Sequence, residues 1–92
     1  MTEKHEFYVR LKEQIEKNHD FPIVYLFKFI IPNDNRVLAL TEALFGAEAE
    51  VQIRQSSKGN YISISGKELM IDADSIINRY KSAEKIKGLI AL

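Results

Sequence analysis

The sequence predicts an α+β domain in which one antiparallel sheet packs against helices. Three observations predict it. Residues 23–31 are rich in β-branched and aromatic side chains, as strands are. Residues 61–65 alternate apolar and small polar side chains directly after a polar turn, as in a strand that leaves a hairpin. The segments on either side of these strands carry apolar residues at helical spacing.

The first predicted element is a helix over residues 3–18, with Thr2 placed to cap its start. Its apolar stripe consists of Phe7 or Tyr8, Leu11 and Ile15. Because the stripe is narrow and so short a helix is marginal alone, we expect it to lie on another surface.

Residues 23–31 form the first predicted strand, which is apolar on both alternating faces except at Lys28. Such a strand is normally central in its sheet. A second helix is expected over residues 36–45, with Asn33 or Asp34 as its N-cap and Gly46 at its end. Its predicted inward stripe consists of Val37, Leu38, Leu40, Leu44 and Phe45.

In residues 48–54 apolar and charged side chains alternate, which predicts a half-buried edge strand. The chain then reverses at residues 56–60, where Gly59 can adopt a positive φ. A third helix begins around Asp72, and residues 89–92 form a short final strand. The inward residues expected on the third helix are Ile76, Ile77, Tyr80 and Ala83.

The predicted order is therefore one additional N-terminal helix followed by β-α-β-β-α-β. A split β-α-β pair of this kind is the ferredoxin-like architecture, with two helices on one face of an antiparallel sheet and the first and third strands in its middle. We expect residues 1–19 to be an N-terminal helical extension and residues 20–92 to be the ferredoxin-like domain.

Composition narrows the class of protein. The chain has 92 residues, and 13 basic residues balance 13 acidic ones, which disfavours nucleic-acid binding. It contains no cysteine, which fits a reducing compartment and excludes thiol chemistry. No apolar run approaches the roughly 20 residues of a membrane helix, and the first residues lack signal-peptide character. We expect a cytoplasmic protein with neither a membrane nor a nucleic acid as partner.

Three segments of the sequence also resemble segments of a known protein family. They are Asp20-Phe21-Pro22 before the first strand, the run Ser56-Ser57-Lys58-Gly59-Asn60-Tyr61 with its serine-rich strand, and the short apolar strand at the end. Over about residues 20–92 the chain resembles the YbeD-like family of small bacterial proteins, for which no activity is established. The resemblance implies a ferredoxin-like fold similar to ACT regulatory domains, which bind small effectors, often amino acids, at subunit interfaces.

The predicted site lies at the tip of the hairpin. The proposed topology brings the loop 32–36, the hairpin 56–60 and the Lys87-Gly88 turn to one end of the sheet. A helix N-terminus beside cationic side chains can accept a carboxylate or a phosphate, although Asp34 could occupy that N-terminus itself. The alternative is that the hairpin is only a turn. The ligand-binding residues predicted here are Arg36, Ser57, Lys58, Gly59 and Asn60.

Other chemistry finds little support in the sequence. Aligning Lys58-Gly59 on an RNA-recognition signature places Asn60 and Ile62, which are not aromatic, at the base-stacking positions. His5 and His19 have no partner at metal-ligand spacing. Because no nucleophile, base and oxyanion donor can be assembled, we predict no catalytic residues, no metal and no cofactor.

The leading hypothesis is a non-enzymatic regulatory or ligand-binding module that senses a small anionic metabolite through the hairpin end. The alternative is a protein–protein interaction module that uses the N-terminal helix and the open face of the sheet. One phase of the first strand must line that face, either Val24, Leu26 and Ile30 around Lys28 or Tyr25, Phe27 and Phe29. Because a bare apolar face is a liability, we expect either the N-terminal helix or a second subunit, in a homodimer, to cover it.

Overall fold

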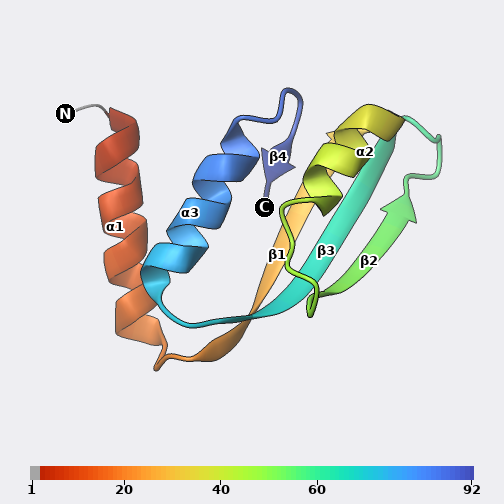
Figure 1. The fold of residues 1–92 in the computed structure, drawn as a ribbon. Coiled ribbons are helices and arrows are strands. Elements are labelled where there is room, and N and C mark those ends of the chain that lie inside the picture. Colours follow the sequence, from red (N-terminus) through yellow and green to blue (C-terminus); the bar gives the residue numbers. More distant parts are fainter. Residues whose placement is uncertain (1–2) are drawn as a thin grey trace.

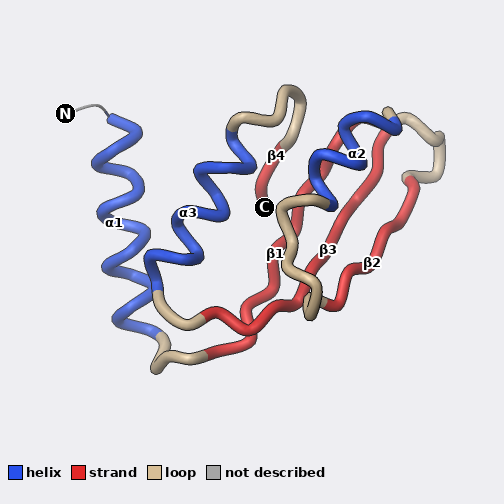
Figure 2. The backbone as a smooth tube through the Cα atoms, in the orientation of Figure 1, coloured by secondary structure: helices blue, strands red, loops and turns tan. Residues whose placement is uncertain are grey.

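The computed structural model describes residues 3–92, which form a four-stranded antiparallel sheet and three helices (Figures 1 and 2). The elements in chain order are α1 Glu3–Asn18, β1 Ile23–Pro32, α2 Asn35–Glu42, β2 Glu50–Gln55, β3 Tyr61–Met70, α3 Ala73–Glu84 and β4 Ile90–Ala91. The strand order is β2-β3-β1-β4, so the predicted central position of β1 and β3 is confirmed. Thr2, the expected cap of the first helix, lies outside the described residues.

Strands β1 and β3 pair along their whole length, from Ile23 opposite Met70 to Pro32 opposite Tyr61. Side chains alternate between the two faces of a strand, and here the phase that includes Phe27 and Phe29 points toward the helices. In β3 the predicted phase is confirmed, because Ile62 and Ile64 are buried while Ser63 and Ser65 point the other way.

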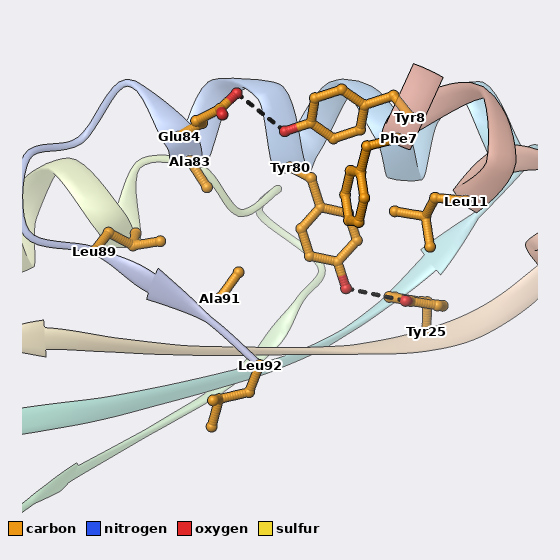
Figure 3. A pocket seen from close by; sticks show the side chains of 10 residues that line it. All are labelled: Phe7, Tyr8, Leu11, Tyr25, Tyr80, Ala83, Glu84, Leu89, Ala91 and Leu92. Carbon is orange, nitrogen blue, oxygen red and sulfur yellow. Dashed lines mark hydrogen bonds between the residues drawn. The ribbon is translucent and has the colours of Figure 1, made fainter. Parts of the chain in front are cut away.

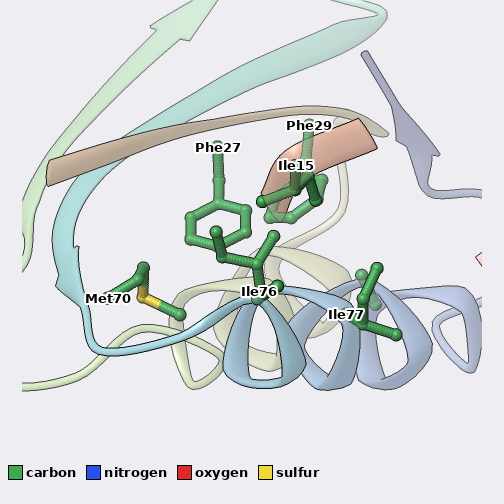
Figure 4. Packing of buried hydrophobic residues seen from close by; sticks show 8 residues of the cluster. Ile15, Phe27, Phe29, Met70, Ile76 and Ile77 are labelled. Carbon is green, nitrogen blue, oxygen red and sulfur yellow. The ribbon is translucent and has the colours of Figure 1, made fainter. Parts of the chain in front are cut away.

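The main core lies between the sheet and helices α1 and α3 (Figure 4). Phe27 and Phe29 are fully buried, and their rings stack with centroids 6.1 Å apart. Ile76 from α3 and Ile15 from α1 pack against these rings. Burying a side chain of this size stabilises the fold by about 1.5–3 kcal/mol. Helix α1 is therefore attached by Ile15 to the same core as α3.

Helix α2 is shorter than the predicted 36–45, because it ends at Glu42 and the chain continues in turns. Its start is capped by Asp34, as expected. Leu40 does not belong to the inward stripe, since 49% of its surface is exposed. Thr41, one residue further, takes the inward position and is fully buried, with its hydroxyl donating to the Val37 carbonyl at 2.8 Å.

The edge position of β2 is confirmed, but the prediction that it is half-buried is wrong. Val51 and Ile53 face the helix side, yet 38% and 48% of their surfaces are exposed. They are exposed because α2 does not extend over β2. Its Val37 and Leu38 pack on Ile31 and on the isoleucines of β3 instead. In the described part of the chain, residues 3–92, no helix therefore covers the apolar side of this edge strand.

A polar contact joins β3 to α3 inside the helix layer. The two terminal guanidinium nitrogens of Arg79 donate to the Glu68 carboxylate, at 2.7 and 3.1 Å, and both side chains are largely buried. Glu68 also accepts from the Gly46 amide at 3.2 Å. These hydrogen bonds, led by that from Arg79, hold the pKa of Glu68 below its ordinary value.

We expect Gly66→Ala to destabilise the protein by about 1–3 kcal/mol, because an added methyl group would overlap the Phe45 ring that lies on Gly66. Ser65→Ala is the matched control on the same strand, where the side chain points to the open face. Urea denaturation measures both. Equal stability of the two variants would contradict the packing described here.

The Glu68–Arg79 pair predicts a pH dependence of stability. The folded state binds the Glu68 proton more weakly than the unfolded chain, so the contribution of the pair is complete above a pH of about 4.5, the ordinary pKa of glutamate, and is lost as the pH falls through the lower, folded pKa. Glu68→Gln should cost about 2 kcal/mol at pH 7 and progressively less toward pH 3. Denaturant midpoints across this range test the expectation, and a cost that does not change with pH would contradict it.

Candidate functional site

A pocket of about 450 Å³ lies between helices α1 and α3 and the strands β1 and β4 (Figure 3). Its walls are mostly apolar and aromatic. They are formed by Phe7, Tyr8, Leu11, Tyr25, Tyr80, Ala83, Glu84, Leu89, Ala91 and Leu92. Volumes of this size and walls of this character are typical of small-molecule sites.

The pocket exists because α1 packs into the hydrophobic core most closely near its C-terminal end. Ile15, in its last turns, is buried in the core, whereas Phe7, two turns earlier, has 60% of its surface exposed. Strand β4 beneath that end pairs with β1 through only two residues, Ile90 and Ala91. The short strand leaves space under the N-terminal half of α1, and the aromatic side chains of α1 reach into this space (Figure 3).

A pair of tyrosines forms the polar part of the floor. The hydroxyl oxygens of Tyr25 and Tyr80 are 3.0 Å apart and share one hydrogen bond. Burial, together with this hydrogen bond, raises the pKa of Tyr80 well above its ordinary value, so the phenol stays neutral. Because only one of the two hydroxyls donates within the pair, the other keeps a proton that it can donate to a ligand.

The rim carries a carboxylate and several lysines. Glu84 accepts from the Tyr8 hydroxyl at 3.0 Å and pairs with Lys4 at 2.7 Å. The hydrogen bond from Lys4, helped by that from Tyr8, lowers the pKa of Glu84. The ammonium of Lys81 lies 5.4 Å from the centre of the Tyr8 ring.

An adjoining depression of about 420 Å³ shares Tyr8 and Glu84 with the pocket. It is lined by Lys4, His5, Tyr8, Lys81, Glu84 and Lys85. Leaving the histidine aside, three lysines face one carboxylate, so the rim has a net positive charge. The pocket thus has an apolar interior, a hydroxyl donor at its floor and cations at its mouth.

The end of the sheet predicted from sequence is assembled as its topology requires. The Asn33 amide donates to the Asn60 carbonyl at 3.0 Å, and the Asn33 side chain donates to the Gly59 carbonyl at 2.7 Å. Gly59 has a positive φ of 75°, as expected. Gly88 lies against Pro32. The loop, the hairpin and the final turn therefore meet at one end of the sheet.

The predicted binding residues at this end differ in their surroundings. The Asp34 carboxylate accepts from the amides of Arg36 and Val37, at 2.8 and 3.2 Å, so the chain caps this helix N-terminus itself. The carbonyls of Gly59 and Asn60 are used within the fold. Ser57 and Lys58 are exposed, and among residues 3–92 their side chains make no hydrogen bond or ion pair. Binding by Arg36, Ser57, Lys58, Gly59 and Asn60 stays a prediction.

The open face of the sheet carries the phase that includes Val24, Leu26 and Ile30 around Lys28. Val24 and Leu26 are 66% and 48% exposed. Helix α1 does not cover this face, because it lies beside α3 and packs into the core on the other side of the sheet (Figure 1). Of the two covers expected from the sequence, the N-terminal helix is therefore excluded, and the second subunit stays a prediction.

Sequence reasoning missed the pocket because four separate elements contribute its walls, and only tertiary packing brings them together. One signal was present. Tyr8, Tyr25 and Tyr80 are tyrosines at positions where phenylalanine would pack equally well, and a partly buried phenol needs a hydrogen-bond partner. Three such residues in one small chain indicate a polar feature inside the helix layer.

Within residues 3–92, no cluster of side chains suits a metal ion and no helix is long and apolar enough to cross a membrane. No family model matches the chain, and comparisons with curated proteins and with solved structures also give no match. The resemblance to the YbeD-like family stays an expectation from the sequence.

Proposed function

We propose that this chain is a non-enzymatic ligand-binding module that takes a small amphipathic anion into the pocket between α1 and α3. The observation that carries the proposal is the combination of an apolar interior with a cationic mouth. The proposal keeps the anionic metabolite expected from the sequence and moves its site from the hairpin end to the pocket.

The chemistry of the walls suggests the class of ligand. An aromatic or medium-length alkyl body fits beside Phe7, Leu11 and Leu89, where burial of apolar surface drives binding. A carboxylate at the other end of the ligand meets Lys81 and Lys85 at the rim. The spare phenol proton at the floor favours a ligand whose inner end carries a hydrogen-bond acceptor.

A binding role also fits the proposed ferredoxin-like, ACT-like architecture, in which a split β-α-β pair places two helices on one face of the sheet. We place the protein in the bacterial cytoplasm with the YbeD-like family on the sequence resemblance and the lack of cysteine. The site supports a regulatory role, because α1 forms one wall and a bound ligand would add contacts between α1 and α3.

Thermal denaturation with 3-phenylpropanoate and octanoate tests the pocket. A ligand at a hundredfold excess over its Kd should stabilise the protein by about 2.7 kcal/mol. The neutral amides of the same acids should stabilise it less, because they lack the charge that the lysines attract. No stabilisation by either acid would contradict the proposed ligand class.

Three variants locate the site. Ala91→Trp should fill the pocket and weaken binding at least about tenfold, whereas Leu26→Trp introduces a tryptophan on the open face and should leave binding unchanged. Lys58→Ala tests the hairpin end. Binding that is lost in Lys58→Ala and kept in Ala91→Trp would return the site to the residues predicted from sequence.

The second candidate function is protein–protein interaction through the open face, and the exposed Val24, Leu26 and Leu69 favour it. We expect the double substitution Leu26→Lys and Leu69→Lys to abolish binding of a purified protein partner. The variant Ala91→Trp should retain this binding. Isothermal titration calorimetry of both variants measures this. A partner that binds the doubly substituted protein unchanged would exclude this face.

A further inference from the structure

Strand β2 leaves an unusually regular edge on the sheet. It forms the outer margin of the sheet opposite α1 (Figure 1). All six of its residues are exposed. Its pairing with β3 keeps one register from Glu50 to Gln55, so it has no bulge, and it contains no proline. Bulges, prolines, very short strands and charged side chains are the usual protection of an edge, and of these β2 has only the charged residues Glu50 and Arg54. The other edge, β4, is protected by its length of two residues.

The hairpin shows which backbone groups of β2 are free. The Ser56 amide donates to the Tyr61 carbonyl at 2.9 Å, in the same ladder that joins β2 to β3. In an antiparallel pair, alternate residues direct their amide and carbonyl groups toward the partner strand. Residues 50, 52 and 54 therefore face β3, and the backbone groups of Val51, Ile53 and Gln55 point out from the edge.

The side chains of β2 are complementary to those of a second, antiparallel copy of β2. When Gln52 lies opposite Gln52 of the second copy, Glu50 lies opposite Arg54 and Val51 lies opposite Ile53, twice each by symmetry. Both ion pairs fall on the open face, and the apolar residues meet on the helix side that α2 leaves uncovered. This register also places the outward backbone groups of Val51 opposite those of Ile53, so that the two residues can form hydrogen bonds between the copies.

Other registers are less favourable. A shift by one residue would place outward backbone groups opposite inward ones, so the ladder could not form. A shift by two residues in one direction places Arg54 opposite Gln52, and in the other direction it places Glu50 opposite Gln52. Neither shift keeps both the charge pair and the Val51–Ile53 pair. Charge and backbone geometry therefore select the register centred on Gln52.

We propose that β2 is a homodimer interface, in which two copies of this chain join edge to edge about Gln52 into one continuous antiparallel sheet. The partner that binds this edge is a second copy of the chain, because the strand β2 is complementary to itself. The two Val51 and two Ile53 side chains then form one apolar cluster on the helix side, and opposite charges flank Gln52 on the other face.

Charge reversal tests the proposal by sedimentation velocity at low ionic strength. Glu50→Arg places arginine opposite Arg54, and Arg54→Glu places glutamate opposite Glu50, so each variant should raise the dimer Kd by about tenfold or more. The double variant, with the charges exchanged, should recover the dimer. An equimolar mixture of the two single variants should form a heterodimer, since both of its charge pairs are then opposite.

The mixing experiment separates the proposal from a loss of folding, because a misfolded variant would not be rescued by its counterpart. Melting temperatures of the single variants should stay near that of the wild-type protein, as both residues are exposed. Leu26→Lys is the control on the open face and should leave the dimer intact. A wild-type protein that is monomeric at millimolar concentration, a dimer indifferent to both charge reversals, or one lost only in Leu26→Lys would overturn the proposal.

Discussion

The ion pair between Glu68 and Arg79 fixes how the two layers of this protein sit on one another. Glu68 belongs to the interior face of β3, Arg79 to α3, and the Gly46 amide that also binds Glu68 to the loop after α2. The guanidinium lies 5.0 Å from the centre of the Phe27 ring and 5.7 Å from that of Phe45. Apolar contacts are non-directional, so they would tolerate a small shift of α3, whereas a bidentate pair does not.

The position of α3 in turn determines the pocket. Tyr80 follows Arg79 directly, and its hydroxyl reaches Tyr25 on β1 only when the helix lies at this height above the sheet. The floor of the pocket is thus held by the Tyr25–Tyr80 hydrogen bond beside the Glu68–Arg79 pair. The wall formed by α1 is attached at Ile15 and at the Glu84 contacts of Tyr8 and Lys4, with little of the sheet beneath it. A floor held in this way limits the ordering that binding requires.

The sequence could predict the order of the elements and the central strands because these depend on the spacing of apolar residues along the chain. The phase of β3 and the cap at Asp34 are local features for the same reason. The exposure of Val51, Ile53 and Leu40 could not be predicted, since it depends on how far α2 extends over its neighbours. The pocket depends on the length of β4, and a strand of two residues has no distinctive pattern.

The proposed interface and the pocket lie at opposite margins of the molecule, because β2 ends the sheet on the side away from α1 (Figure 1). Residues opposite one another in a strand pair share a face, so joining two β2 edges would place both helix layers on one side and both open faces on the other. Each copy would keep its pocket accessible. The two patches of Val24, Leu26 and Leu69 would then belong to one extended surface with a two-fold axis through Gln52. A partner with two matching sites would bind such a surface more tightly than it binds either patch alone, since its second contact is intramolecular.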